Sequence, residues 1–327
     1  RPERLPGRSV VRRLALSGDG RSLLYTRESM TAPPDAYALD VKTLRETRLT
    51  DLNGKVMAGL TLPSVEEIWY DGASLPDGTR QKVHAFLVRP NGVPAGTKVP
   101  VVLMIHGGPQ GSWLNGFHPR WSPLGIAGKG IAVALPNITG STGYGQAFVN
   151  AVSRDWGGRP FEDTMALLDH LGTLDGLDTT RAAAMGGSYG GYMVNWIEGH
   201  SDRFKCLISH AGPAELTSKY GSTDELWFPE WEMGGTPWDK PEAYAKWSPH
   251  TYASAFKTPM LVIHGANDFR VPLEQALVMF TLLKRQGVES RLIVYPDETH
   301  FVAKPSNRKH WNDSVIDWLC RFLKPGT

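Results

Sequence analysis

The stretch RAAAMGGSYGGYMVNWIE, residues 181–198, contains an apolar run, a glycine-rich turn and a segment with helical apolar spacing. Glycines at 186 and 190 permit a sharp turn from strand to helix, which lifts the hydroxyl of Ser188 clear of a sheet. The helix behind Ser188 has the positive end of its dipole there, and the amide of Tyr189 is placed to donate to an oxyanion. We therefore predict that Ser188 is a nucleophile.

A serine nucleophile needs a base, and the base needs an acid that orients it; in folds with this turn both follow the serine, acid first. Asp268 follows an apolar strand at 260–264, and His300 follows the next strand, 290–295, through a short loop. Catalytic groups in open parallel sheets gather at the carboxyl ends of the strands. The sequence thus predicts Asp268 as the acid and His300 as the base.

Other residues stay open for these two roles. Asp268 is also placed to cap the helix that follows it, in which case Asp297 or Glu298 is the reserve acid, and His300 is also readable as an exposed loop histidine. His264 precedes the acid and His310 falls inside the last helix, so we expect both to be structural.

The chain from residue 65 onward alternates strands and helices, which predicts an α/β fold with a doubly wound, mostly parallel sheet and helices on both faces. Continuous apolar runs indicate strands buried on both faces. The expected strands are 68–71, 83–89, 100–106, 131–136, 181–185, 204–210, 260–264 and 290–295, and the expected helices are 161–171, 189–198, 273–286 and 307–322.

Residues 9–53 have a different pattern, with four short strands at 9–16, 21–27, 35–40 and 47–52. Four antiparallel strands match one blade of a β-propeller in length, and a lone four-stranded extension fits nearly as well. One blade cannot close a propeller, so we expect the chain to be the C-terminal part of a longer protein. The predicted domains are residues 1–60, a blade or remnant, and 61–327, a catalytic domain.

Composition excludes several classes of protein. The 327 residues include 35 basic and 33 acidic side chains, which gives a net charge of +2. A nucleic-acid-binding protein needs a strongly basic surface, so a charge this small argues against that class. No apolar stretch approaches the roughly 20 residues that span a bilayer, so we expect no membrane segment. Cys206 and Cys320 are too few for a zinc site, and are either two buried thiols or one bridge. We expect no cofactor and no metal ion.

Two further segments bear on the site. His106-Gly107-Gly108-Pro109 follows the expected strand 100–106, where lipase-type hydrolases place an amide in the oxyanion hole, and Gly108 N–H is our candidate; a plain glycine turn is the alternative. The aromatic run from Trp227 and Phe228 to residue 247 either lines a hydrophobic P1 pocket or packs a cap segment on the sheet.

Taken together, the motifs resemble the catalytic part of the prolyl oligopeptidase family of serine peptidases, which has an α/β-hydrolase fold, over residues 65–327. The matching strings are HGGP at 106–109, NITGSTGYG at 137–145, DWGG at 155–158, GGSYGGYM at 186–193, DFRVP at 268–272, and the histidine at 300. The segment 209–238 is most similar to the dipeptidyl-peptidase V and acylaminoacyl-peptidase branches, and residues 9–53 fit the end of the family's propeller.

The resemblance implies a triad of Ser188, Asp268 and His300, with the amide of Tyr189 and the loop from His106 to Gly108 as oxyanion hole. It also implies that Arg270, with Val271 next to it, contacts the substrate backbone near P2.

The sequence departs from the family pattern at two positions. Thr139 stands where the family has arginine, which puts a local salt bridge in doubt. His106 replaces a tyrosine that some branches use as an oxyanion donor, so a backbone amide or the imidazole must serve. Related dipeptidyl peptidases pair cysteines like Cys206 and Cys320, which favours a bridge and a periplasmic or secreted location, without excluding the cytoplasm.

The resulting hypothesis is a serine exopeptidase that releases dipeptides from the N-terminus of peptides through an acyl-enzyme on Ser188. An acylaminoacyl-peptidase or esterase is the alternative in the same class, and a non-catalytic interaction module is the alternative in another. The expected partners are a peptide substrate and the protein's own propeller, and a homodimer stays open.

Overall fold

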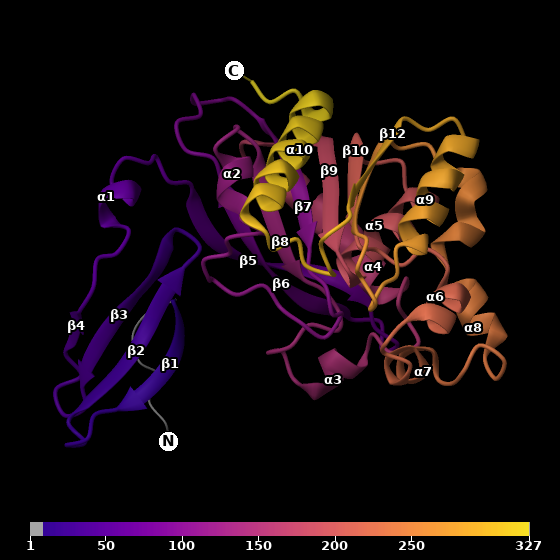
Figure 1. The fold of residues 1–327 in the computed structure, drawn as a ribbon. Helices are drawn as coiled ribbons and strands as arrows, with labels where there is room; N and C mark the ends of the chain where they lie inside the picture. The colour runs from indigo at the N-terminus through magenta and orange to yellow at the C-terminus, as the bar shows by residue number, and fades with distance from the viewer. Residues whose placement is uncertain (1–8, 327) are drawn as a thin grey trace.

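The computed structural model describes residues 9–326, which form two separate β-sheets (Figure 1). The larger sheet has eight strands in the order β12-β11-β10-β9-β7-β8-β6-β5. The pairs β5–β6 and β6–β8 are antiparallel, and every other neighbouring pair is parallel. The predicted α/β fold with a mostly parallel sheet is therefore confirmed.

The eight strands and four helices predicted from residue 65 onward are present, whereas the shorter helices within residues 9–326 were not predicted. The strands of the large sheet are β5 (Ser64–Ser74), β6 (Arg80–Arg89), β7 (Val99–Ile105), β8 (Ala132–Asn137), β9 (Leu177–Gly187), β10 (Cys206–His210), β11 (Met260–Gly265) and β12 (Ser290–Tyr295). The helices are α1 (Gly54–Met57), α2 (Pro123–Ala127), α3 (Gln146–Asn150), α4 (Arg159–Gly172), α5 (Tyr189–His200), α6 (Leu216–Ser222), α7 (Trp227–Met233), α8 (Pro241–Lys246), α9 (Glu274–Arg285) and α10 (Pro305–Leu323), with a 3₁₀ segment at Pro249–Ala255. No helix within residues 9–326 is long and apolar enough to cross a membrane.

Helices cover both faces of the large sheet because its central strands are apolar on both sides. Every residue of β7 is buried; Leu103 and Ile105 belong to the core beneath α4, α5 and α9, whereas Val102 and Met104 belong to the core beneath α2 and α10. Successive side chains of a strand point to opposite faces, so one apolar run supplies two cores.

The small sheet is an antiparallel meander of β1 (Val10–Leu16), β2 (Ser22–Ser29), β3 (Ala32–Asp40) and β4 (Glu46–Arg48), set to one side of the large sheet (Figure 1). Four strands were expected, but the last is shorter than the predicted 47–52. The carboxylate of Asp35 accepts hydrogen bonds from Thr50 Oγ1 and from the amide of Leu52, and these bonds replace the ladder there.

The predicted domain boundary near residue 60 stays a prediction. The two sheets fall on either side of it, since β4 ends at Arg48 and β5 begins at Ser64. Residues 1–8 and 327 of the two predicted ranges lie outside the described residues.

The structure does not contain the bridge expected between Cys206 and Cys320, because both are free thiols. Cys206 is buried on β10, and Cys320 on α10 packs against the same apolar core. Burial raises the pKa of the Cys206 thiol far above its usual range. Both side chains act here as small apolar groups.

Candidate active site

Ser188 occupies the turn between β9 and α5 with φ 59° and ψ −121°, a conformation in the left-handed half of the φ range. Its amide donates to the carbonyl of His210 on the neighbouring strand (2.9 Å). A Cβ at Gly190 would lie 2.1 Å from the carbonyl oxygen of Ile105, so only glycine lets the turn pack against β7. The predicted strained strand-to-helix turn is thus present.

Asp268 and His300 meet although 32 residues separate them. His300 Nδ1 lies 2.7 Å from Asp268 Oδ2, and both side chains are buried. The other carboxylate oxygen of Asp268 accepts hydrogen bonds from the amides of Arg270 (3.1 Å) and Val271 (3.0 Å). The carboxylate therefore holds the histidine and the turn after β11 at once.

His264 is a further neighbour of this carboxylate. Its Nε2 lies 2.6 Å from the carbonyl oxygen of Val271 and 3.4 Å from Asp268 Oδ2. Burial alone would raise the pKa of Asp268, but hydrogen bonds from His264, His300 and the Val271 amide hold it well below its usual range. The acid is therefore ionised, and His264, expected to be structural, helps to position it.

His210, at the carboxyl end of β10, supports the loop that carries His300. Its Nε2 lies 3.3 Å from the carbonyl oxygen of His300, and Trp311 Nε1 donates to its Nδ1 (3.3 Å). Burial, with the nearby His264 and His300, lowers the pKa of His210 to about 3, so the ring is neutral. Sequence reasoning missed this role; the one available signal was a histidine ending a predicted strand.

The loop after β7 brings Gly107 against the serine. A Cβ at Gly107 would lie 2.9 Å from the carbonyl oxygen of Gly187 and 3.1 Å from Ser188 Cβ, so a side chain there would block the turn. The Gly108 amide donates to no acceptor within residues 9–326, so it is available to an anion beside Ser188.

The imidazole of His106 does not serve as the donor that the sequence left open. Its Nε2 lies 2.8 Å from Ser141 Oγ, and its Nδ1 lies 2.8 Å from the carbonyl oxygen of Gly107. Burial lowers the pKa of His106 to about 4, so the ring is neutral and both nitrogens already have partners in the protein. A backbone amide is left for the oxyanion role.

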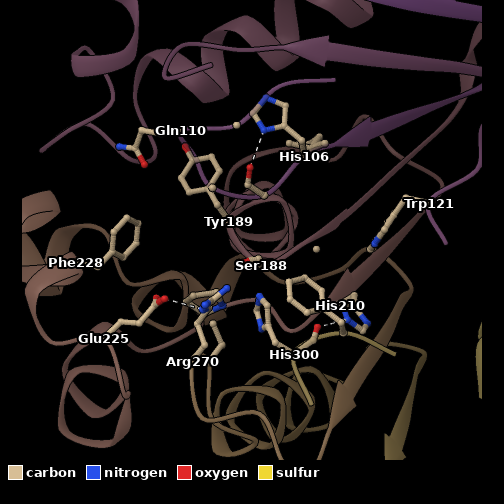
Figure 2. Close-up of a pocket in the computed structure, with 18 of the residues that line it drawn as sticks. His106, Gln110, Trp121, Ser188, Tyr189, His210, Glu225, Phe228, Arg270 and His300 are labelled. Carbon is tan, nitrogen blue, oxygen red and sulfur yellow. Dashed lines mark hydrogen bonds and ion pairs between the residues drawn. The ribbon is translucent and has the colours of Figure 1, made fainter. Parts of the chain in front are cut away.

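Ser188, His300 and the loop from His106 to Gly108 line a pocket of about 580 Å³ (Figure 2). Phe228, Glu225 and Arg270 lie on one side of Ser188, and Trp121 and His210 lie on the other (Figure 2). All four predicted substrate-binding residues line it: Trp227, Phe228, Arg270 and Val271. Trp227 is 68% exposed. The guanidinium of Arg270 pairs with Glu225 at 2.7 Å, a partner that the sequence did not reveal.

Asp297 and Glu298, the reserve candidates for the acid, interact with other groups and not with His300. Asp297 pairs with Lys304 on the surface. Glu298 accepts hydrogen bonds from the amides of Ala303 and Lys304 (3.0 Å each) at the start of α10. His310, inside α10, forms a hydrogen bond through Nδ1 with the hydroxyl of Tyr295 at the end of β12 (2.9 Å), as expected for a structural histidine.

Thr139 takes part in a buried network where the family pattern has arginine. Its amide and hydroxyl donate to Asp163 Oδ2 (2.7 and 2.6 Å), and Gln81 donates to the same hydroxyl (2.7 Å). The amide of Ala73 satisfies the other carboxylate oxygen (2.7 Å). Short polar groups thus replace the salt bridge that the departure put in doubt.

A second buried carboxylate, Glu232, supports the pocket wall from behind. It accepts hydrogen bonds from Gln110 Nε2 and Trp156 Nε1, 2.7 Å each, and both of these residues line the pocket. Nothing local in the sequence marks this glutamate as buried, so these contacts could not be predicted from it. Within residues 9–326 no group of three or more His, Cys, Asp or Glu side chains is arranged to hold a metal ion.

Ser188 occupies a strained turn between β9 and α5, Asp268 follows β11, and His300 follows β12 in the eight-stranded sheet. This arrangement is that of an α/β-hydrolase-fold protein. The sequence model of the prolyl oligopeptidase family matches residues 117–326. The chain belongs to that family.

Relatives and solved structures agree with this assignment. Dipeptidyl-peptidase 5 of Schizosaccharomyces pombe is 37% identical over 306 residues, which cover 93% of this chain and 44% of the relative. Dipeptidyl-peptidase 5 of Trichophyton equinum is 40% identical over 280 residues, which cover 81% of this chain and 36% of the relative. The acylaminoacyl peptidase of Pyrococcus horikoshii superposes with a TM-score of 0.88 at 28% identity, covering 98% of this chain and 51% of that one. The chain thus spans about half the length of the proteins it matches, and the small sheet fits one blade of a propeller.

Proposed function

We propose that the protein is a serine exopeptidase that cleaves near the N-terminus of peptides through an acyl-enzyme on Ser188. The observation that carries the proposal is the 2.7 Å bond between Asp268 and His300 in the pocket that also holds Ser188 on its strained turn. The names of the relatives, dipeptidyl-peptidase 5, support the release of dipeptides.

In the first half of the reaction, Ser188 Oγ attacks the scissile carbonyl while His300 Nε2 takes its proton. Ionised Asp268 keeps the proton of His300 on Nδ1 and stabilises the imidazolium that forms. The amides of Tyr189 and Gly108 stabilise the oxyanion. When the C–N bond breaks, His300 returns the proton to the leaving amine, and water then hydrolyses the ester by the same route.

Ser188 Oγ and His300 are not hydrogen-bonded to each other in this structure. Contacts between nucleophile and base are often long without substrate and tighten when it binds. Labelling with a fluorophosphonate tests the assignment: we expect the native protein to be labelled and Ser188→Ala not to be, with exposed Ser222→Ala as the matched control. Equal labelling of Ser188→Ala would leave the interaction-module alternative standing.

The acylaminoacyl-peptidase activity is the second candidate, and the likeness to the Pyrococcus enzyme favours it. Within residues 9–326 the one carboxylate that lines the pocket, Glu225, pairs with Arg270. Comparing Lys-Ala and Ala-Ala anilides with acetylated alanine anilide separates the two activities. Turnover of the acetylated substrate alone would exclude dipeptide release.

A further inference from the structure

A lysine is buried in the wall of the pocket without a carboxylate partner. Lys219 lies on α6, its side chain is 3% exposed, and it lines the same pocket as Ser188. Its Nζ lies 5.8 Å from the ring centroid of Phe228, and this ammonium group makes no hydrogen bond or ion pair within residues 9–326. Lysine is almost never buried unless it is paired, so an unpaired one beside a nucleophile calls for an explanation.

No carboxylate within residues 9–326 forms an ion pair with this lysine, although Glu225, Asp224 and Asp268 act on it from farther away. Among the described residues, the lysines, arginines and acidic side chains that line the pocket are Arg120, Lys219, Arg270 and Glu225. Glu225 pairs with Arg270, and Arg120 lies over the ring of Phe301, 4.6 Å from its centroid. Cations therefore outnumber carboxylates among the described side chains that line the pocket, with ionised Asp268 behind His300, and a substrate anion would find a cation there to pair with.

The ammonium is charged at neutral pH. Burial lowers the pKa of Lys219 to about 8, which Glu225, Asp224 and Asp268 oppose and Arg270 reinforces. A protonated ammonium in a partly enclosed pocket binds a carboxylate more strongly than the same pair would bind in water.

We propose that Lys219 binds an acidic side chain on the substrate residue whose carbonyl Ser188 attacks, so that the enzyme cleaves after aspartate or glutamate. The inference rests on the serine peptidase function proposed above. Lys219 lies against Phe228, one of the two aromatic residues for which the sequence left a P1 pocket open, whereas Arg270 is already held by Glu225. The stem of the acidic side chain would pack on Phe228 and its carboxylate would reach Nζ.

The test compares matched pairs of substrates on the full-length protein. Coumarin amides carry Asp or Asn, and Glu or Gln, at P1, each as a free-amine dipeptide and as an acetylated amino acid. We expect the wild type to prefer the acid over its amide by about ten- to hundredfold in kcat/KM, the effect of one charge-assisted hydrogen bond. Lys219→Met should lose this preference, and Lys205→Met, an exposed lysine outside the pocket, should keep it.

The deciding quantity is the ratio of kcat/KM for the acidic substrate to kcat/KM for its amide. A loss of turnover in Lys219→Met that is equal for both substrates leaves this ratio unchanged. Phosphonate inhibitors with Asp or Asn side chains give the same ratio as a rate of labelling of Ser188 where turnover is slow. A higher melting temperature of Lys219→Met at neutral pH would show that it folds and that a buried charge is gone.

Three outcomes would overturn the inference: no preference for the acid in the wild type, a preference that Lys219→Met retains, or a Lys219-dependent preference for an acid at P2 instead of P1. If Ser188 is labelled but the enzyme shows no preference for an acid at P1, the inference about Lys219 is wrong and the proposed serine peptidase function stands. Absence of labelling overturns the proposed function itself.

Discussion

Asp268 Oδ2 lies 2.7 Å from His300 Nδ1, while Asp268 Oδ1 binds the amides of Arg270 and Val271. One carboxylate therefore fixes both the orientation of the histidine and the backbone that carries the pocket residues Arg270 and Val271. Because hydrogen bonds hold its pKa well below the usual range, the carboxylate stays ionised throughout the neutral range.

Replacement of Asp268 by asparagine should lower kcat by about 10³- to 10⁴-fold, because an amide can hold His300 in the wrong tautomer. Steady-state kinetics and the rate of fluorophosphonate labelling check this. Asp297→Asn is the matched control, since that carboxylate pairs with Lys304 on the surface, and it should retain activity. Loss of activity in the control but not in Asp268→Asn would transfer the role of acid to Asp297.

Gly107→Ala should abolish labelling of Ser188 and reduce activity by about 100-fold or more, because displacement of a reacting group by about 1 Å has that effect. The added methyl group would meet Gly187 O at 2.9 Å and Ser188 Cβ at 3.1 Å. Gly18→Ala, where a Cβ meets nothing within 4 Å, should be neutral. Full activity of Gly107→Ala would mean that this loop does not press on the serine.

Glu198→Gln should stabilise the protein near pH 8 and have little effect near pH 4.5. Burial raises the pKa of Glu198 to about 8, opposed only in part by hydrogen bonds from the amides of Thr258 and Lys257. Between its unfolded value of about 4.3 and about 8 the native state retains a proton that the unfolded state loses, so the stability of the wild type falls as the pH rises.

The expected gain for Glu198→Gln is about 1–3 kcal/mol near pH 8. Urea unfolding at several pH values measures it, with exposed Glu242→Gln as the control. A gain that is equal at pH 4.5 and pH 8 would exclude titration of Glu198 as its cause.

Thr139→Val should destabilise the protein by about 1–3 kcal/mol, because it removes a hydroxyl donor from the buried carboxylate of Asp163 and the acceptor of Gln81. Urea unfolding compares it with Thr142→Val, whose exposed hydroxyl makes one long bond to Ser112 (3.3 Å). If both variants lose the same stability, the Asp163 network contributes nothing specific.

Local patterns were enough for the residues that end strands. Ser188, Asp268 and His300 each follow an apolar run, and the carboxyl ends of parallel strands meet at one edge, so their proximity could be predicted before any contact was known. The glycines around the serine carried a similar local signal, since the turn leaves no room for a Cβ at Gly190.

Non-local pairing escaped prediction. Lys219, Glu232 and Asp163 look like ordinary surface charges in the sequence, and burial by segments far away gives them their roles. The expected bridge between Cys206 and Cys320 came from resemblance, and the structure keeps both as thiols in an apolar core.

The sequence by itself determined the order of strands and helices, the strained turn at Ser188 and the three residues assigned to catalysis, because each depends on neighbours within a few positions. Three features depend on the tertiary structure alone. The ring nitrogens of His106 are hydrogen-bonded to Ser141 and Gly107, Arg270 forms an ion pair with Glu225, and the ammonium of Lys219 has no ion-pair partner within residues 9–326. The reason is physical: the partner and solvent exposure of a charge depend on the elements packed around it, and these come from distant parts of the chain.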